Sequence, residues 1–97
     1  MIEDLLNENI TLLYVSSNTC SVCGVMKQKI EGLLKEYYAE LELTEVKIDE
    51  NPLLKGELMI FSVPAIIVYY EKKEVYRKAG YLDIAELDKI LERVYTV

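Results

Sequence analysis

The sequence predicts one α/β domain in which a βαβ unit is followed by a ββα unit around a four-stranded mixed sheet. Two apolar runs, Ile10–Ser16 and Ala65–Tyr70, have the β-branched and aromatic composition of buried strands. Segments with apolar residues at helical spacing lie before, between and after these runs. The length of 97 residues suits a single domain over 1–97 that buries a modest core.

The first half of the chain gives a βαβ unit preceded by a short helix. Residues 1–9 carry apolar side chains on one side, which favours an amphipathic helix. Ile10–Ser16 is apolar throughout, as a strand buried on both faces would be. A loop with three possible N-cap residues leads into a helix over 20–40, and alternation indicates a strand over 44–48. A right-handed crossover should make the two strands parallel.

The second half gives a ββα unit. Asn51 at the cap and Pro52 at the first helical position mark a helix start, and Asp83 caps the last helix. The two strands between these helices form an antiparallel hairpin, although its turn lacks the usual Asn-Gly pair. The expected elements are a helix over 53–60, strands over Ala65–Tyr70 and 74–78, and a helix over Ile84–Tyr95.

Composition excludes several classes of protein. The 17 acidic and 11 basic residues give a net charge of −6, which repels phosphate backbones, so no nucleic-acid partner is expected. The longest uncharged apolar run, over 63–70, is far too short to span a bilayer, so no membrane partner is expected. Charged residues follow Met1 almost at once, unlike in a signal peptide, so we expect a cytoplasmic protein. We also expect it to be a monomer.

The two cysteines lie in the segment Cys20-Ser21-Val22-Cys23, where the first strand meets the long helix. Sulfurs at this spacing can close a small disulfide and reopen it. We place Cys20 at the first helical position, where free backbone N–H groups favour a thiolate. Its pKa is therefore expected to lie below the usual value of about 8.5.

Two other interpretations of this pair remain open. Both cysteines could be small core residues, the usual fate of a free cysteine. A metal could instead be shared between two chains. A structural zinc ion needs four ligands, and the chain has no histidine and no third cysteine, so no metal and no other cofactor is expected.

Three landmarks resemble the thioredoxin family. The first is the Cys-x-x-Cys segment over 20–23 at a strand-to-helix junction. The second, over 47–52, reads Lys-Ile-Asp-Glu-Asn-Pro and resembles the family's strand ending in Asp followed by Asn-Pro. The third, Ser-Val-Pro-Ala over 62–65, resembles the family's Val-Pro-Thr segment, and Gly80 falls where the family has a glycine. The resemblance covers residues 10–97 and implies a thioredoxin-like fold whose usual first strand is missing or shortened.

The resemblance also assigns roles. It makes Cys20 the exposed attacking cysteine and Cys23 the less exposed one that resolves the mixed disulfide. It implies a cis peptide before Pro64, which leaves the backbone of Val63 able to pair with an extended substrate segment. The residues expected to face the substrate are Thr19, Val22, Val63, Pro64, Gly80 and Tyr81.

The chain departs from the family pattern at several positions. Thr19 replaces the family tryptophan, Ser21-Val22 replaces Gly-Pro, and Ala65 replaces the threonine after the proline. Tyr14 stands where the family has a buried aspartate that helps to move the proton of the resolving thiol. A tyrosine with a pKa near 10 is a poor base at pH 7. Water or a carboxylate from elsewhere could serve, turnover could be slow, or Tyr14 could simply fill the core.

These features predict a thiol–disulfide oxidoreductase that reduces disulfides of proteins, or of small molecules, through Cys20 and Cys23. No nucleotide motif is present, so electrons are expected from a separate reductase. A glutaredoxin-like, glutathione-linked reductase is a variant of this hypothesis, although no cationic cluster for the glutathione carboxylates is evident. The alternative is a binding or scaffold module that keeps the fold with weak catalysis or none.

Overall fold

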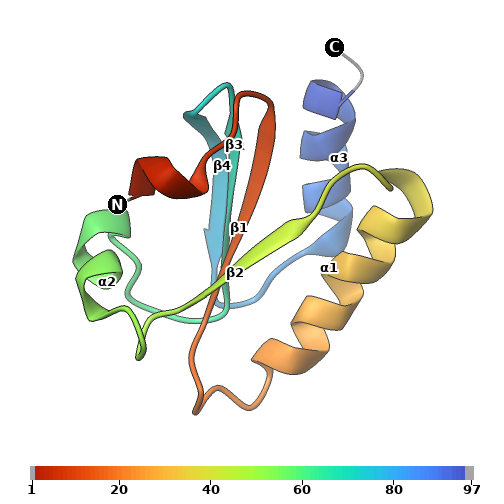
Figure 1. Ribbon diagram of the computed structural model, residues 1–97. Coiled ribbons are helices and arrows are strands. Elements are labelled where there is room, and N and C mark those ends of the chain that lie inside the picture. Colours follow the sequence, from red (N-terminus) through yellow and green to blue (C-terminus); the bar gives the residue numbers. More distant parts are fainter. Residues whose placement is uncertain (1, 96–97) are drawn as a thin grey trace.

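A mixed sheet with strand order β2-β1-β3-β4 forms the centre of the computed structural model, which describes residues 2–95 (Figure 1). The strand β1 pairs in parallel with β2, and β3 is antiparallel to both β1 and β4. This confirms the predicted βαβ and ββα units around a four-stranded sheet. Within the described residues no strand precedes β1. The strands are β1 Ile10–Ser16, β2 Leu43–Lys47, β3 Ala65–Tyr70 and β4 Lys73–Ala79.

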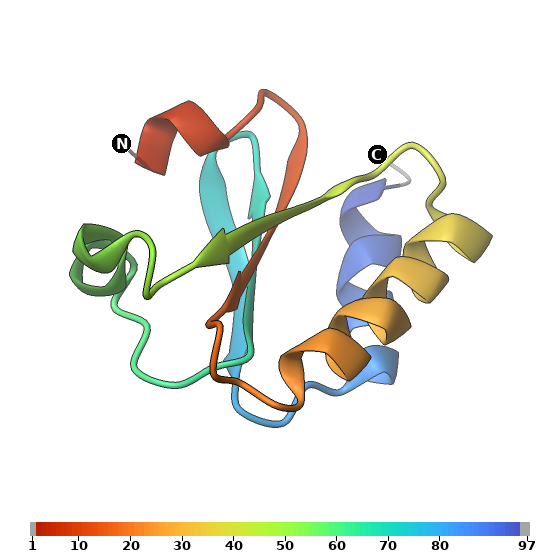
Figure 2. The same cartoon turned by 60° about the horizontal axis from the view of Figure 1, so that its bottom comes forward.

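Helices cover both faces of the sheet (Figures 1 and 2). On one face lie α1, Cys23–Tyr37, and α3, Ile84–Tyr95, which contact each other. On the other face lie α2, Pro52–Leu58, and the 3₁₀ helix η1, Ile2–Leu5. The loop that carries the cysteines leaves β1 at the lower end of Figure 1, where the start of β3 and the end of β4 also lie.

The central strand β1 divides the core into two layers. Side chains alternate across a strand, so Leu12 and Tyr14 enter the cluster under α1 and α3, and Leu13 and Val15 enter the cluster under α2. Every residue of β1 is buried, as predicted from its apolar run. The two clusters fix the position of β1, and β1 in turn fixes the loop that follows Ser16.

The N-terminal helix is shorter than predicted. Only Ile2–Leu5 is helical, as one 3₁₀ turn, and Met1 lies outside the described residues. The Asn7 side-chain oxygen accepts a bond from the Asn9 N–H at 2.8 Å, and the Asn7 N–H bonds to Thr11 Oγ1 at 3.0 Å. These bonds form a turn that competes with helix, so the prediction of a helix through residue 9 is wrong.

The long helix begins at Cys23 and ends at Tyr37, so the predicted range 20–40 is too wide at both ends. The Cys20 N–H bonds to the Ser17 carbonyl at 3.3 Å in a turn, and the first helical bond joins Met26 N–H to the Val22 carbonyl at 3.1 Å. At the other end Tyr38 leaves the helix with φ −139° and ψ 54°. Its ring is buried and edge-on to Tyr95, with centroids 5.0 Å apart. Packing of this ring therefore ends the helix early.

The hairpin between β3 and β4 has a two-residue turn in which both residues have positive φ. Glu71 has φ 52° and Lys72 has φ 68°. This is the geometry that normally selects Asn-Gly, and its adoption by two residues with long side chains is unfavourable locally. Tertiary pairing of the two strands overrides this local preference. The strand β4 extends one residue beyond the predicted 74–78 at each end.

Candidate functional site

The cysteine pair forms a disulfide at the end of β1, with an S–S distance of 2.13 Å and a Cα–Cα distance of 5.5 Å. Cys23 is 5% exposed, and Cys20 is partly exposed. Cys20 is therefore the more accessible sulfur of the two. The prediction that Cys20 occupies the first helical position is wrong, because that position belongs to Cys23. The disulfide still holds the Cys20 sulfur against the first residue of α1, where backbone N–H groups lack intrahelical partners.

A shallow apolar groove is lined by Val22, which lies between the two cysteines in the sequence, and by Val63 and Pro64, which precede β3. The Val63–Pro64 peptide is cis, as the family resemblance implied. The Gly80 N–H bonds to the Pro64 carbonyl at 2.9 Å, and Gly80 has φ 85°, a conformation that favours glycine. Among the described residues nothing hydrogen-bonds the backbone of Val63. A segment laid along the groove therefore meets an unpaired main chain.

The structure brings together five of the six residues expected to face a substrate. Val22, Val63, Pro64, Gly80 and Tyr81 all line the groove. Val22 is 56% exposed and Tyr81 is 80% exposed, so both side chains are available to a partner.

Thr19 is the residue that the groove does not include. It is exposed in the turn before Cys20, and its hydroxyl lies 3.4 Å from that of Ser17. Three further groove residues were not expected: Val25, Met26 and Lys29. They follow Val22 by three, four and seven positions, which is the spacing of one helical face. Helical periodicity counted from Val22 would have found them.

Tyr14, in the family's aspartate position, contacts the backbone of Cys23, the first residue of α1. Its side chain has no exposed surface, and its hydroxyl donates a hydrogen bond of 2.6 Å to the Cys23 carbonyl. Burial, and then the negative charge of Glu45, raise the pKa of Tyr14 to about 12. At neutral pH the phenol is therefore a neutral donor that ties the first turn of α1 to the sheet, and it cannot act as a base.

Glu45 on β2 is the carboxylate beside Tyr14 in the sheet, where the two residues are register partners. Its oxygens accept bonds from Lys27 Nζ at 2.8 Å and from Ser16 Oγ at 2.6 Å. These two bonds lower the pKa of Glu45, and the bond to Glu45 raises the pKa of Lys27. Lys47 Nζ lies 4.0 Å from Glu45 Oε2. No sequence pattern distinguishes this ionised, hydrogen-bonded carboxylate, because Glu45 is one acidic residue among many.

Residues 2–95 show neither a metal site nor a membrane-spanning helix. No group of three or more His, Cys, Asp or Glu side chains comes together there as a metal site. None of the helices in this part of the chain has the length and apolar character needed to cross a bilayer.

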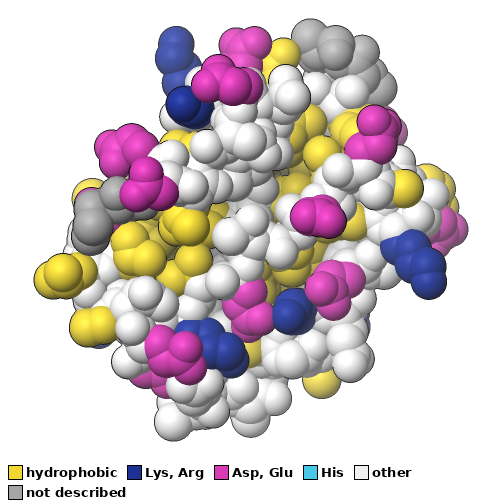
Figure 3. Space-filling model, in the orientation of Figure 1, with side chains coloured by type: hydrophobic (Ala, Val, Ile, Leu, Met, Phe, Trp, Pro, Cys, Tyr) yellow, Lys and Arg dark blue, Asp and Glu magenta, His cyan; other side chains and the backbone are white. Residues whose placement is uncertain are grey.

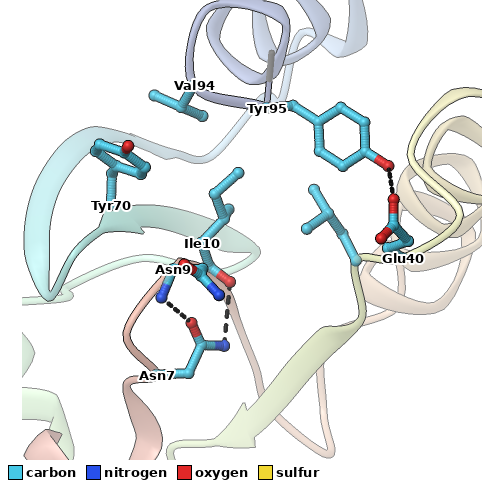
Figure 4. A pocket seen from close by; sticks show the side chains of 8 residues that line it. Asn7, Asn9, Ile10, Glu40, Tyr70, Val94 and Tyr95 are labelled. Atoms are coloured by element: carbon cyan, nitrogen blue, oxygen red, sulfur yellow. Dashed lines mark hydrogen bonds between the residues drawn. The ribbon is translucent and has the colours of Figure 1, made fainter. Parts of the chain in front are cut away.

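Two more surface features lie away from the cysteines. A hollow of about 440 Å³ opens at the start of β1, the end opposite to the disulfide (Figure 4). Its polar groups bond within the chain, for example Tyr95 Oη to Glu40 Oε1 at 2.7 Å and Asn7 Nδ2 to the Ile10 carbonyl at 3.1 Å. Hydrophobic side chains also gather over α2 and η1 (Figure 3), where Leu53 is 76% exposed.

Comparison with known proteins gives consistent results. A family model described as Thioredoxin matches residues 2–93. Thioredoxin-like protein YdfQ of Bacillus subtilis is 23% identical over 95 residues, covering 97% of this chain and 84% of that protein. Thioredoxin of Staphylococcus saprophyticus is 21% identical over 91 residues, covering 94% of this chain and 88% of that protein.

Solved structures share the fold. Fasciola hepatica thioredoxin superposes with a TM-score of 0.80 at 23% identity, covering 96% of this chain and 90% of that one. Thioredoxin 1 from Thermosipho africanus gives a TM-score of 0.77 at 27% identity, covering 89% and 94%. The family model spans nearly the whole chain, and the four-stranded sheet, the Cys20–Cys23 disulfide and the cis-proline agree with it. The chain therefore belongs to the thioredoxin family.

Proposed function

We propose that this protein is a thiol–disulfide oxidoreductase that reduces disulfide bonds of protein substrates. The observation that carries the proposal is the asymmetry of the cysteine pair: Cys20 is partly exposed, and its partner Cys23 is 5% exposed. In this reaction the Cys20 thiolate attacks a substrate disulfide and forms a mixed disulfide. Cys23 then displaces the substrate and closes the observed Cys20–Cys23 bond.

The groove supports an extended polypeptide as substrate. Main-chain pairing at an open backbone binds many sequences, because it uses groups that every residue has. The backbone of Val63, with no hydrogen-bond partner among the described residues, offers that pairing in the groove. The exposed side chains of Val22 and Tyr81 flank it and would contact apolar substrate side chains.

Glutathione fits the same groove less well. Of the residues that line the groove, Lys29 alone is charged, whereas glutathione carries two carboxylates. One exposed ammonium pairs weakly with a carboxylate in water. We therefore favour protein disulfides, with electrons returned by a separate reductase in the cytoplasm, where reduction is the favoured direction. A cytoplasmic location and a monomeric state stay predictions.

The test is turnover of a protein disulfide with dithiothreitol as electron donor. The wild-type protein should reduce the substrate faster than dithiothreitol alone, and Cys20→Ser should abolish the gain. Cys23→Ser should instead accumulate a covalent adduct with the substrate at Cys20, visible by mass spectrometry, because the resolving sulfur is gone.

The same assay contains the outcome that favours a binding module. A wild-type protein that binds the substrate and gives no turnover above dithiothreitol would contradict the proposed activity. Val63→Pro supplies a control on the binding mode, since it removes the backbone N–H next to Pro64 and should weaken substrate binding while both cysteines remain.

A further inference from the structure

We propose that Lys29 is a specificity-determining residue, which selects substrate segments that carry a carboxylate close to the cysteine under attack. This inference rests on the proposed oxidoreductase function and names the class of protein disulfide that the groove favours. Lys29 is exposed, and among the described residues that line the groove it alone is charged. The other lining residues contact an extended segment without distinguishing its acidic side chains from its basic ones.

The Lys29 side chain has no partner within residues 2–95, where it makes neither a hydrogen bond nor an ion pair. Residues three and four positions apart are neighbours on a helix surface. At these distances from Lys29 the helix α1 carries only uncharged residues: Val25, Met26, Gly32 and Leu33. The ammonium is therefore available to a carboxylate that arrives with a substrate.

The charged residues that flank Lys29 in the sequence interact with other groups. Lys27 Nζ donates a hydrogen bond of 2.8 Å to Glu45 Oε1, and the charge of Glu31, one helical turn further on, acts on Lys27 and raises its pKa. Asp83, which follows the last groove residues, accepts two backbone N–H bonds at the start of α3, at 3.0 and 3.2 Å. The groove therefore presents an unpaired positive charge on a protein whose net charge is −6.

The length of α1 between the cysteines and Lys29 sets where the substrate carboxylate should lie. Val22 directly precedes Cys23, whose Cα lies 5.5 Å from that of Cys20, so a substrate sulfur joined to Cys20 starts at this end of the groove. Lys29 follows Cys23 by six residues, which is about 9 Å of helix rise. An extended chain covers that distance in about three residues, at about 3.3 Å each. The selected acid should therefore lie about three positions from the substrate cysteine.

The size of the selection follows from the exposure of the pair. Exposed ion pairs are weak, so a glutamate at the right position should raise the rate of attack by about 2- to 5-fold over an uncharged glutamine. A lysine at the same position should lower the rate by a similar factor. The overall negative charge of the protein repels an acidic segment, but at physiological ionic strength exposed charges more than about 8 Å apart are largely screened. The contact with Lys29 therefore decides the preference.

The experiment uses the full-length reduced protein and short blocked peptides whose single cysteine is carried as a thiopyridyl disulfide. Cys20 attacks the peptide sulfur, the bond from that sulfur to the thiopyridyl sulfur breaks, and thiopyridone leaves with the proton of the Cys20 thiol. Absorbance of thiopyridone therefore follows formation of the mixed disulfide. The peptides carry Glu, Gln or Lys at the third residue before or after the cysteine, with alanine elsewhere. Comparison of the Glu peptide with the Gln peptide, as a ratio of rates, cancels any change in the reactivity of Cys20 itself.

The variants separate a contact at Lys29 from a general effect of charge. In the wild-type protein the Glu peptide should react about 2- to 5-fold faster than the Gln peptide at one of the two positions, and about 1 M salt should reduce this advantage. Lys29→Gln should bring the ratio to about one, and Lys29→Glu should favour the Lys peptide. The matched control is Lys35→Glu, which makes the same change of net charge at an exposed position of α1 outside the groove and should keep the wild-type ratio.

Three outcomes would overturn the assignment. These are a wild-type ratio of about one at both peptide positions, an advantage of the Glu peptide that survives in Lys29→Gln, and an advantage that disappears in Lys35→Glu. If Lys29→Glu does not fold, the ratio in Lys29→Gln decides alone. A reduced wild-type protein that releases no thiopyridone from any peptide would instead refute the oxidoreductase function itself, so the two failures are distinguishable.

Discussion

Replacement of Tyr14 by Phe isolates one hydrogen bond to the backbone of Cys23. The variant keeps the buried ring and loses the hydroxyl that lies 2.6 Å from the Cys23 carbonyl oxygen. Cys23 is the first residue of α1, so its carbonyl keeps an ordinary intrahelical bond and is not left without a partner. The loss should therefore equal the net value of one buried bond, about 1 kcal/mol of unfolding free energy.

The assay is thermal and urea unfolding of oxidised protein, with Tyr14→Ala as comparison. In a domain of this size 1 kcal/mol corresponds to a fall of about 4–8 °C in Tm. Tyr14→Ala also removes the ring from the core and should cost about 3–5 kcal/mol. Because the phenol is neutral below its pKa of about 12, Tyr14→Phe should not move the pH profile of turnover in the dithiothreitol assay.

Two results would refute this reasoning. If Tyr14→Phe is as stable as wild type, the bond to the Cys23 carbonyl contributes nothing to the fold. If it is as unstable as Tyr14→Ala, the hydroxyl and not the packing of the ring dominates at this position.

Three further predictions concern stability. Gly32→Ala should raise the unfolding free energy by about 0.5–1 kcal/mol, because this exposed helical position has nothing within 4 Å of an added Cβ; a lower urea midpoint would contradict it. Glu71→Asn with Lys72→Gly should stabilise the β3–β4 turn by about 1 kcal/mol, since both residues have positive φ; an unchanged Tm would argue against local strain. The Glu45 pKa is lowered on folding, so its contribution is present above the unfolded pKa of about 4.3 and is lost as pH falls through the folded value. Wild type and Glu45→Gln should therefore converge in stability in strong acid, and a constant difference would contradict this.

Much of the fold could be predicted because each element has an unambiguous local pattern. The apolar run Ile10–Ser16 is typical of a strand buried on both faces, and it forms one of the two interior strands of the sheet. The positions of Pro52 and Asp83 at helix starts follow from backbone chemistry, and Asp83 Oδ1 indeed accepts the Ala85 N–H at 3.0 Å. Errors occurred at element ends, where tertiary contacts such as the buried Tyr38 decide.

The candidate site was predictable only in part. Val22, Val63 and Tyr81 could be placed in one groove because they lie near the cysteines or the proline in the sequence pattern. Glu45 could not be found this way, because no motif marks it. Its contacts depend on the parallel register of β1 and β2 and on the position of Lys27 on α1, and neither is visible before the chain is folded.

The cost of burying a charge accounts for a tyrosine on the interior strand β1 and a glutamate on the edge strand β2. The Tyr14 side chain has no exposed surface, and an ionised carboxylate there would lose its hydration without a cation in hydrogen-bond contact. Glu45 lies on an edge strand with 22% of its side chain exposed, and it gains an ammonium and a hydroxyl as partners. An edge position therefore keeps a carboxylate ionised at lower cost than a central one. A carboxylate at this edge position therefore stays ionised, where the same group on the central strand would tend to take up a proton and become neutral.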